Sequence, residues 1–299
     1  MEKFDRVLFI PDVHGRRFWK KACEDFLASG EPGHIVFLGD YLDPYEFEGV
    51  TWRNCVANFK EILEYAKERR DTVTLLLGNH DMHYWTEEPI DHVRYSFVFC
   101  NEIHRLFHDN EDLFSIAWEC ECGKRKILAT HAGVTAGWIT ACKRLSEEKD
   151  EKAGLIRVPD YDAGILNGIL EEANRRHNDD ILLPFQMISR DRGGRWWAGS
   201  CIWADIREHF DSFESADCPY QVFGHTLSYP PFDNFDMIEV TDRFAMLDGR
   251  GAVLMTPGGD FPVFTRLHTD EPLVDRVRRN PQDFPDIVKA KPIKNRQSD

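Results

Sequence analysis

Five short segments of the chain place potential metal ligands directly after apolar, strand-like runs. They supply carboxylates, imidazoles and one amide, which are ligands for hard or borderline divalent metals. In chain order the segments are 12–14 (Asp-Val-His), 39–43 (Gly-Asp-Tyr-Leu-Asp), 78–81 (Gly-Asn-His-Asp), 130–133 (Thr-His-Ala-Gly) and 224–226 (Gly-His-Thr). One such segment is weak evidence for a site. Five of them at successive strand ends indicate one site at which they converge.

The residue types suit a pair of cations about 4 Å apart. Asp40 suits the bridging position, because each of its carboxylate oxygens can bind one metal. Asp12 and His14 are separated by one residue, so both side chains can face the same way beyond a strand and hold the first metal. The second metal would be held by Asn79, His131 and His225.

His80 follows Asn79 directly and points elsewhere, which suits a general acid that protonates a leaving-group oxygen. Asp43 could orient this imidazole and raise its pKa, as a carboxylate partner does for an imidazolium. Asp81 is the alternative for the orienting role, or a residue that caps the loop.

Alternating strands and helices must position these segments. Apolar runs at 7–10, 35–38 and 73–77 predict buried strands, and residues 16–29 and 54–69 have the apolar spacing of helices. This order predicts right-handed crossovers and a mostly parallel sheet, with function at the carboxyl ends of the strands. The later elements that we expect are a helix over 92–108, a hairpin of 113–118 with 125–129, and strands at 220–223, 237–240, 244–247 and 252–255.

Residues 1–268 are predicted to form a single domain with a cap-like insertion at about 146–217, where the sequence becomes charged, Gly-rich and aromatic. The tryptophans at 196, 197 and 203 could stack a nucleobase, but we favour packing of the cap onto the core. Residues 269–299 hold four prolines and many charges. This composition predicts an extended C-terminal tail.

Charge and composition exclude several classes of function. The net charge of −15 argues against binding to long nucleic acid, because phosphate neutralisation needs a basic surface. The start of the chain does not resemble a secretory signal, and there is no apolar run long enough to cross a bilayer. Eight scattered cysteines fit a reducing cytosol. We therefore expect a cytoplasmic protein without membrane contact; its oligomeric state is left open.

The five segments, taken in order, resemble the calcineurin-like metallophosphoesterase superfamily over about residues 5 to 230. That family's pattern is an Asp-x-His, a Gly-Asp-x-x-Asp, a Gly-Asn-His-Asp/Glu, a His and a Gly-His. The resemblance implies an α/β fold of two packed mixed β-sheets flanked by helices, in four layers. It also implies a dinuclear metal site, with Mn²⁺ as the first expectation and Fe or Zn²⁺ as alternatives. By this likeness the ligands are Asp12, His14, Asp40, Asn79, His131 and His225, and the acid pair is His80 with Asp43.

Two details bear on the branch of the family. Leu227 stands where many phosphodiesterases have a second His, and this, with Thr-His-Ala-Gly at 130–133, looks more like the phosphoprotein-phosphatase and diadenosine-tetraphosphatase branch. That branch has Arg-Gly after its second Asp, whereas here Asp43 is followed by Pro-Tyr. The phosphate-gripping arginine of that loop is therefore missing. Candidate substitutes are Arg16 near the site loops, and Arg192 and Arg195 in the cap.

These observations predict a phosphoesterase that hydrolyses phosphomonoesters through a bridging hydroxide nucleophile and a His general acid. The substrate would be a small phosphorylated molecule or a phosphoprotein. One alternative is a dinucleoside polyphosphate or phosphodiester hydrolase. Another is a non-catalytic interaction scaffold on the same fold, which we disfavour because His80, Asp43 and all six ligand positions are kept.

Overall fold

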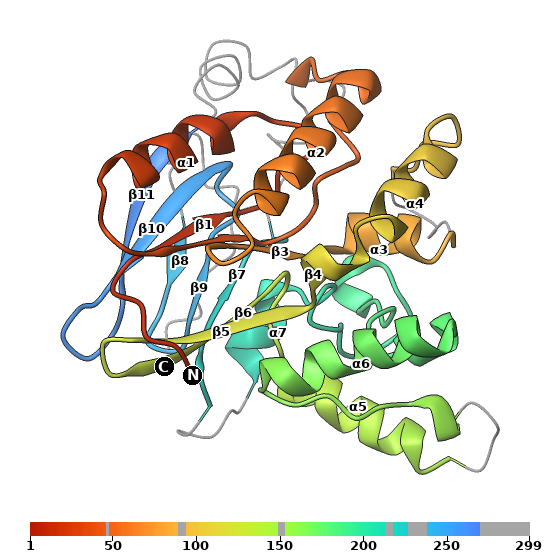
Figure 1. Cartoon of the computed structure of the whole chain (residues 1–299). Helices are drawn as coiled ribbons and strands as arrows, with labels where there is room; N and C mark the ends of the chain where they lie inside the picture. The colour runs from red at the N-terminus through yellow and green to blue at the C-terminus, as the bar shows by residue number, and fades with distance from the viewer. Residues whose placement is uncertain (46–47, 89–93, 149–152, 213–217, 227–237, 270–299) are drawn as a thin grey trace, which may run out of the picture.

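The computed structural model describes residues 1–45, 48–88, 94–148, 153–212, 218–226 and 238–269. Two mixed β-sheets pack together, and helices flank them (Figure 1). This is the predicted fold class. The predicted tail and Leu227 lie outside the described residues.

The first sheet contains the predicted parallel strands. Its order is β11-β10-β1-β2-β3-β4, in which β1 to β4 run parallel and β10 and β11 are antiparallel. β1 and β2 are completely buried, which agrees with their continuous apolar sequences. The strands are β1 (Val7–Ile10), β2 (His34–Phe37), β3 (Val73–Leu76), β4 (Phe114–Ser115), β10 (Gly251–Thr256) and β11 (Val263–Thr269).

The second sheet has the order β5-β6-β7-β9-β8. β6, β7 and β9 are parallel to one another, while β5 forms a hairpin with β6 and β8 pairs antiparallel with β9. Each sheet thus contributes parallel strands whose carboxyl ends share an edge. The strands are β5 (Ala117–Cys122), β6 (Arg125–Thr130), β7 (Tyr220–Phe223), β8 (Glu239–Val240) and β9 (Phe244–Met246).

The apolar run at 113–118 is divided between the two sheets, so the expectation of one strand there is wrong. β4 pairs with β3 in the first sheet, and β5 begins at Ala117 in the second. The backbone N–H groups of Ile116 and Ala117 donate to Asn167 Oδ1 at 2.9 and 3.0 Å. Because a side chain takes these two donors, the ladder ends and the chain changes sheets.

The helices form the outer layers. α1 and α2 cover the outer face of the first sheet, and α5, α6 and α7 lie on the side of the second sheet (Figure 1). The helices are α1 (Phe18–Ala28), α2 (Trp52–Lys67), α3 (Asn79–Trp85), α4 (Cys100–His108), α5 (Ala136–Ser146), α6 (Ala163–Arg176) and α7 (Ile206–Asp211). Short 3-10 helices are η2 (Glu111–Leu113), η3 (Ala153–Leu155), η4 (Asp179–Leu182) and η5 (Arg190–Arg192).

The helix expected over 92–108 begins only at Cys100. Upstream of it, the Ser96 N–H donates to the Tyr84 hydroxyl at 2.8 Å instead of entering a helical ladder. This hydrogen bond attaches the segment to α3. The sequence analysis did not predict a helix at α3.

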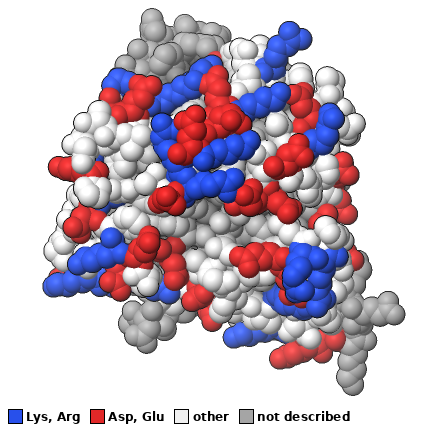
Figure 2. Space-filling model, in the orientation of Figure 1, with Lys and Arg blue, Asp and Glu red and all other residues white. Residues whose placement is uncertain are grey.

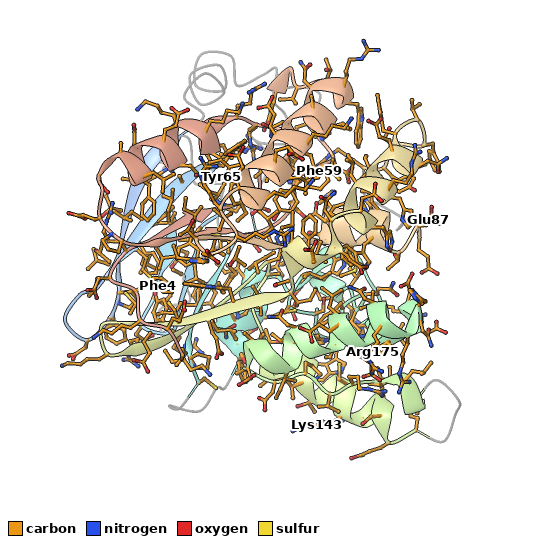
Figure 3. All side chains as sticks on the ribbon, viewed as in Figure 1. Phe4, Phe59, Tyr65, Glu87, Lys143 and Arg175 are labelled. Carbon is orange, nitrogen blue, oxygen red and sulfur yellow. The ribbon has the colours of Figure 1, made fainter. Side chains whose placement is uncertain are left out.

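One apolar core lies between the two sheets. It joins side chains of β1, β2 and β3 to side chains of β5, β6, β7 and β9. A larger core lies under the helices, where Phe59 of α2 is fully buried with its ring 4.9 Å from Phe107 and 5.3 Å from Tyr41 (Figure 3). Burial of such aromatic rings contributes strongly to the stability of this core.

The surface is mixed in charge. On the face that carries α1 and α2, basic and acidic side chains of the described residues are interspersed (Figure 2). Within the described part of the chain, no helix has the length and apolar character that a bilayer crossing requires.

Candidate metal centre

The six predicted ligand positions lie together where the carboxyl ends of strands from both sheets meet. Two groups of side chains that include Asp40 have ligand atoms within 4.8 Å of one another, and a third such group, Asp43 with His80 and His83, lies beside them. The first is His14, Asp40 and His80, and the second is Asp40, His131 and His225. Asp40 belongs to both groups, which is the position expected of a bridging carboxylate.

Asp40 faces an imidazole on each side. Its Oδ2 lies 3.5 Å from His14 Nε2 and also 3.5 Å from His131 Nε2. Its Oδ1 accepts the backbone N–H of His80 at 2.9 Å. This third contact fixes the carboxylate plane between the two imidazoles.

Backbone carbonyls orient both imidazoles in the way that metal-binding histidines require. His14 Nδ1 lies 2.7 Å from the Leu42 carbonyl, and His131 Nδ1 lies 2.7 Å from the Leu38 carbonyl. A carbonyl only accepts, so each Nδ1 carries the proton and each Nε2 lone pair faces Asp40.

The remaining ligand positions complete the second group. His131 Nε2 lies 3.0 Å from Asn79 Oδ1 and 3.1 Å from His225 Nδ1. The carboxylate of Asp12 accepts the backbone N–H of His225 at 3.0 Å and so links the ends of β1 and β7. His225 Nε2 is buried and has no hydrogen-bond partner among the described residues.

Several of these residues have a left-handed backbone that is costly for side chains other than glycine. His14, Asp40, Asp43 and His225 have φ of 43°, 54°, 56° and 64°. Each such residue costs about 1–3 kcal/mol and persists only where its surroundings enforce it. The centre is thus held in shape by the ends of the strands.

Glycines permit the close approach of two carboxylates. A Cβ on Gly78 would overlap Asp40 Oδ1, and a Cβ on Gly224 would overlap Asp12 Oδ2. Only glycine therefore allows β3 and β7 to end directly against these carboxylates.

Asp81 caps the loop, which was the second of its predicted alternatives. Its carboxylate accepts the backbone N–H groups of Gly78, Asp40 and Tyr41 at 2.9, 2.7 and 3.0 Å. It is fully buried and ties the end of β3 to the end of β2.

The predicted acid pair forms a short contact beside the centre. His80 Nδ1 lies 2.6 Å from Asp43 Oδ2. Burial raises the pKa of Asp43, but hydrogen bonds from His80 and His83 outweigh it and hold that pKa below its usual range. Burial lowers the pKa of His80 to about 4, although Asp43 acts in the opposite direction.

The electrostatics of this group of side chains fit divalent cations. Burial and the neighbouring Asp12 raise the pKa of Asp40 well above its usual range. Burial and the nearby His80 lower the pKa of His14, and burial and Arg192 lower that of His225. Both shifts favour the neutral forms of these side chains. A bound cation would instead favour the charged carboxylate of Asp40. The oxygen and imidazole donors are of the type that binds Mn²⁺, Fe or Zn²⁺.

The three candidate arginines have different positions. Arg16 is buried and donates to the Asp12 carbonyl at 2.5 Å and to Glu48 at 3.2 Å. Arg192 donates to Thr226 Oγ1 at 2.5 Å, beside His225. Arg195 is exposed and lies over the ring of Trp196.

Other charged residues near the centre were missed from the sequence. Arg94 Nε donates to the Asp43 carbonyl at 3.0 Å, and Arg250 Nη1 lies 2.9 Å from Glu48 Oε1. Asp248 follows β9 as the predicted ligands follow their strands, a signal that could have identified it. Burial and Asp12 raise the pKa of Asp248 to about 8.

The tryptophans of the predicted cap differ in how deeply they are buried. Trp203 is buried, and its ring lies 5.9 Å from that of His225, almost perpendicular to it. Trp197 is half exposed. Trp203 therefore packs the segment that was predicted to form a cap against a predicted ligand.

Comparison with known proteins identifies a family match. The family model for calcineurin-like phosphoesterases matches residues 5–229. A comparison with curated proteins gives no match.

Several solved structures are similar to this one. A mutant of a cold-active protein tyrosine phosphatase is 15% identical with a TM-score of 0.45, over 89% of this chain and 81% of that one. A hypothetical protein from Pyrococcus horikoshii OT3 is 11% identical with a TM-score of 0.39, over 95% and 96% of the two chains. A serine/threonine phosphatase from Saccharomyces cerevisiae is 13% identical with a TM-score of 0.39, over 88% and 79%.

Proposed function

The chain belongs to the calcineurin-like phosphoesterase family and is a phosphoester hydrolase, and from this premise we propose that it hydrolyses phosphomonoesters at a dinuclear metal centre. The observation that carries the proposal is the position of the Asp40 carboxylate between His14 and His131, with the pair of His80 and Asp43 beside it. The proposed substrate is a small phosphorylated molecule or a phosphoprotein, and the proposed location is the cytoplasm.

The ligand positions divide between two cations. Asp12 and His14 would hold one cation, Asp40 would serve both, and the second would be held by Asn79, His131 and His225. When bound, the two cations would acidify a water so that it can act as nucleophile and would stabilise negative charge on the phosphoryl oxygens. Mn²⁺ is our first choice, with Fe or Zn²⁺ as alternatives.

His80 is proposed to protonate the leaving-group oxygen. Its Nδ1 contacts Asp43, so its Nε2 is left to face the ester. Burial disfavours the charged form of this imidazole, whereas Asp43 favours it. A phosphate dianion beside the ring supplies negative charge that acts in this direction.

Arg192 is our preferred phosphate-binding residue among the three candidates. Its position beside His225, on the cap side of the centre, supports this role. Arg16 is less suitable because it is buried and donates to the backbone carbonyl of Asp12. Arg195 is also a weaker candidate, because it is exposed and lies over the Trp196 ring.

Hydrolysis of matched esters tests the proposal. The chain is stripped with a chelator, reloaded with Mn²⁺, and assayed on p-nitrophenyl phosphate, its bis ester and a dinucleoside polyphosphate. We expect the monoester to have the highest kcat/KM and the stripped chain to be inactive. Higher kcat/KM on the diester or the dinucleoside polyphosphate would favour the alternative hydrolase. Activity on none of them would favour the scaffold.

A further inference from the structure

The short helix α3 contributes more to the centre than the predicted ligand Asn79. His80, His83 and Tyr84 share one of its faces, because residues three and four apart are neighbours on a helix. All three side chains meet the carboxylate of Asp43.

Asp43 is fully buried, and α3 contacts both of its oxygens. Oδ2 lies 2.6 Å from His80 Nδ1 and 3.1 Å from His83 Nε2. Oδ1 accepts the Tyr84 hydroxyl at 2.7 Å. Contacts on both oxygens fix the plane of the carboxylate, which one contact would not do.

The two additional residues are themselves held in place. The Tyr84 oxygen accepts the backbone N–H of Ser96 at 2.8 Å, so its single proton is directed at Asp43. The Tyr84 ring stacks on Tyr95, with centroids 4.7 Å apart and an interplanar angle of 11°. The His83 side chain is fully buried, and packing holds its ring, which lies edge-on to that of Tyr95 with centroids 5.3 Å apart.

We propose that His83 and Tyr84 are positioning residues of the acid pair. They hold the Asp43 carboxylate in the orientation that binds His80 Nδ1 and turns His80 Nε2 toward the leaving group. Neither residue touches the substrate. The inference rests on the proposed function, since it assigns these residues to the protonation step of that reaction.

The test measures how the loss of activity depends on the leaving group. Tyr84→Phe and the wild type, both loaded with Mn²⁺, are compared on p-nitrophenyl phosphate, phenyl phosphate and a simple alkyl phosphate. We expect kcat/KM to fall about tenfold or more on the alkyl ester and less than about twofold on the nitrophenyl ester, because nitrophenolate leaves without a proton. An equal loss on all three esters would overturn the proposal.

Tyr41→Phe is the matched control, because it removes the same atom from an equally buried ring. The Tyr41 hydroxyl donates to the Leu76 carbonyl at 2.8 Å. We expect its ratio of activities on the three esters to equal that of the wild type. His83→Leu should behave like Tyr84→Phe, and His83→Gln, which keeps a donor, should recover part of the loss. If His83→Leu does not fold, Tyr84→Phe decides alone.

Proton NMR of the metal-free chain gives a readout that does not depend on activity. The Nδ1 proton of His80 is identified as the low-field resonance that disappears in His80→Gln. We expect it to shift or broaden in Tyr84→Phe and to be unchanged in Tyr41→Phe. An unchanged resonance in Tyr84→Phe would contradict the inference. A wild type that hydrolyses none of the esters contradicts the proposed function instead, and the resonance then still decides whether α3 positions the pair.

Discussion

The two sheets hold their parts of the centre in different ways. On the first sheet, the loops after β1, β2 and β3 hold one another: Asp81 ties the end of β3 to Asp40, and His14 bonds to the Leu42 carbonyl. On the second sheet, the imidazoles of His131 and His225 depend on groups from elsewhere.

The second-sheet ligands receive their support across the interface and from the cap. His131 Nδ1 is oriented by the Leu38 carbonyl of the first sheet, and the backbone N–H of His225 donates to Asp12. On the cap side, Trp203 packs against the His225 ring and Arg192 bonds to Thr226. The first sheet thus builds a self-supporting half, and the second sheet supplies ligands that are positioned by contact with it.

Asp40→Asn is predicted to have the largest effect, because Asp40 lies between the ligands of both proposed cations. The amide keeps the volume but loses the charge and one of the two acceptor oxygens. We expect the metal content to fall from two cations toward none, with loss of hydrolysis. The number of metal ions bound per chain is measured by metal analysis after dialysis.

Variants that remove a ligand of only one proposed cation test the same comparison more sharply. His14→Gln should lose only the cation that is held with Asp12, and His225→Gln only the cation that is held with Asn79 and His131. If Asp40→Asn keeps two tightly bound cations, Asp40 does not bridge the halves.

His80→Ala is predicted to cause the second largest loss of activity. His80 lies on the self-supporting first-sheet side, yet no predicted ligand atom is removed. We expect kcat to fall about 10²–10⁴-fold on esters with poor leaving groups, which is the usual contribution of a general acid. Metal content should stay at the wild-type value. Hydrolysis at an unaltered rate would show that the assigned acid is wrong.

The difference between the halves also explains what the sequence could predict. The ligand positions follow apolar runs, and parallel strands deliver their carboxyl ends to one edge, so local patterns suffice to bring Asp12, Asp40 and Asn79 together. The supporting residues have no such pattern. Arg94 reaches the Asp43 carbonyl across fifty-one positions of sequence, and Arg250 reaches Glu48 from a turn after β9. Such partners are defined only by the tertiary fold.

One local pattern that does predict supporting residues is the helix that follows β3. α3 begins at the predicted ligand Asn79, and a helical reading from there would have placed His83 and Tyr84 beside His80. The branch point at Ile116 had no local signal, because its two N–H groups are taken by Asn167, about fifty residues later.

Asp81→Asn tests the self-supporting half through stability. The carboxylate accepts three buried backbone N–H groups, and an amide keeps one acceptor and turns an NH₂ group toward the remaining donors. We expect a loss of about 3 kcal/mol in the free energy of unfolding, measured by urea denaturation.

Asp205→Asn is the matched variant on the cap side. Asp205 caps α7 and contacts Arg192, and asparagine is itself a good helix cap. We expect a loss of about 1 kcal/mol, because the ion pairs with Arg192 and Arg207 lose the negative charge. Equal losses in the two variants would contradict the view that the first half supports itself more strongly.

The last prediction concerns His34, which lies where the two sheets meet at the opposite end of β2 from Asp40. Its imidazole stacks on Trp118 of β5, with centroids 5.0 Å apart, and contacts Thr74 Oγ1 at 2.9 Å. Burial lowers its pKa from 6.5 to about 4. Between these values the unfolded chain binds a proton that the folded chain does not, so stability is complete above about pH 6.5 and falls as the pH drops toward 4.

This linkage amounts to about 2 kcal/mol lost between neutral pH and about pH 5. His34→Gln should therefore lose about 2 kcal/mol less than the wild type over that interval, whatever its stability at neutral pH. Urea denaturation at the two pH values measures the difference, with the exposed His177→Asn as control. Identical pH dependence in the wild type and His34→Gln would mean that the sheet interface admits the charged imidazole. The packing between the sheets at this end would then be looser than at the centre, where the two halves depend on each other.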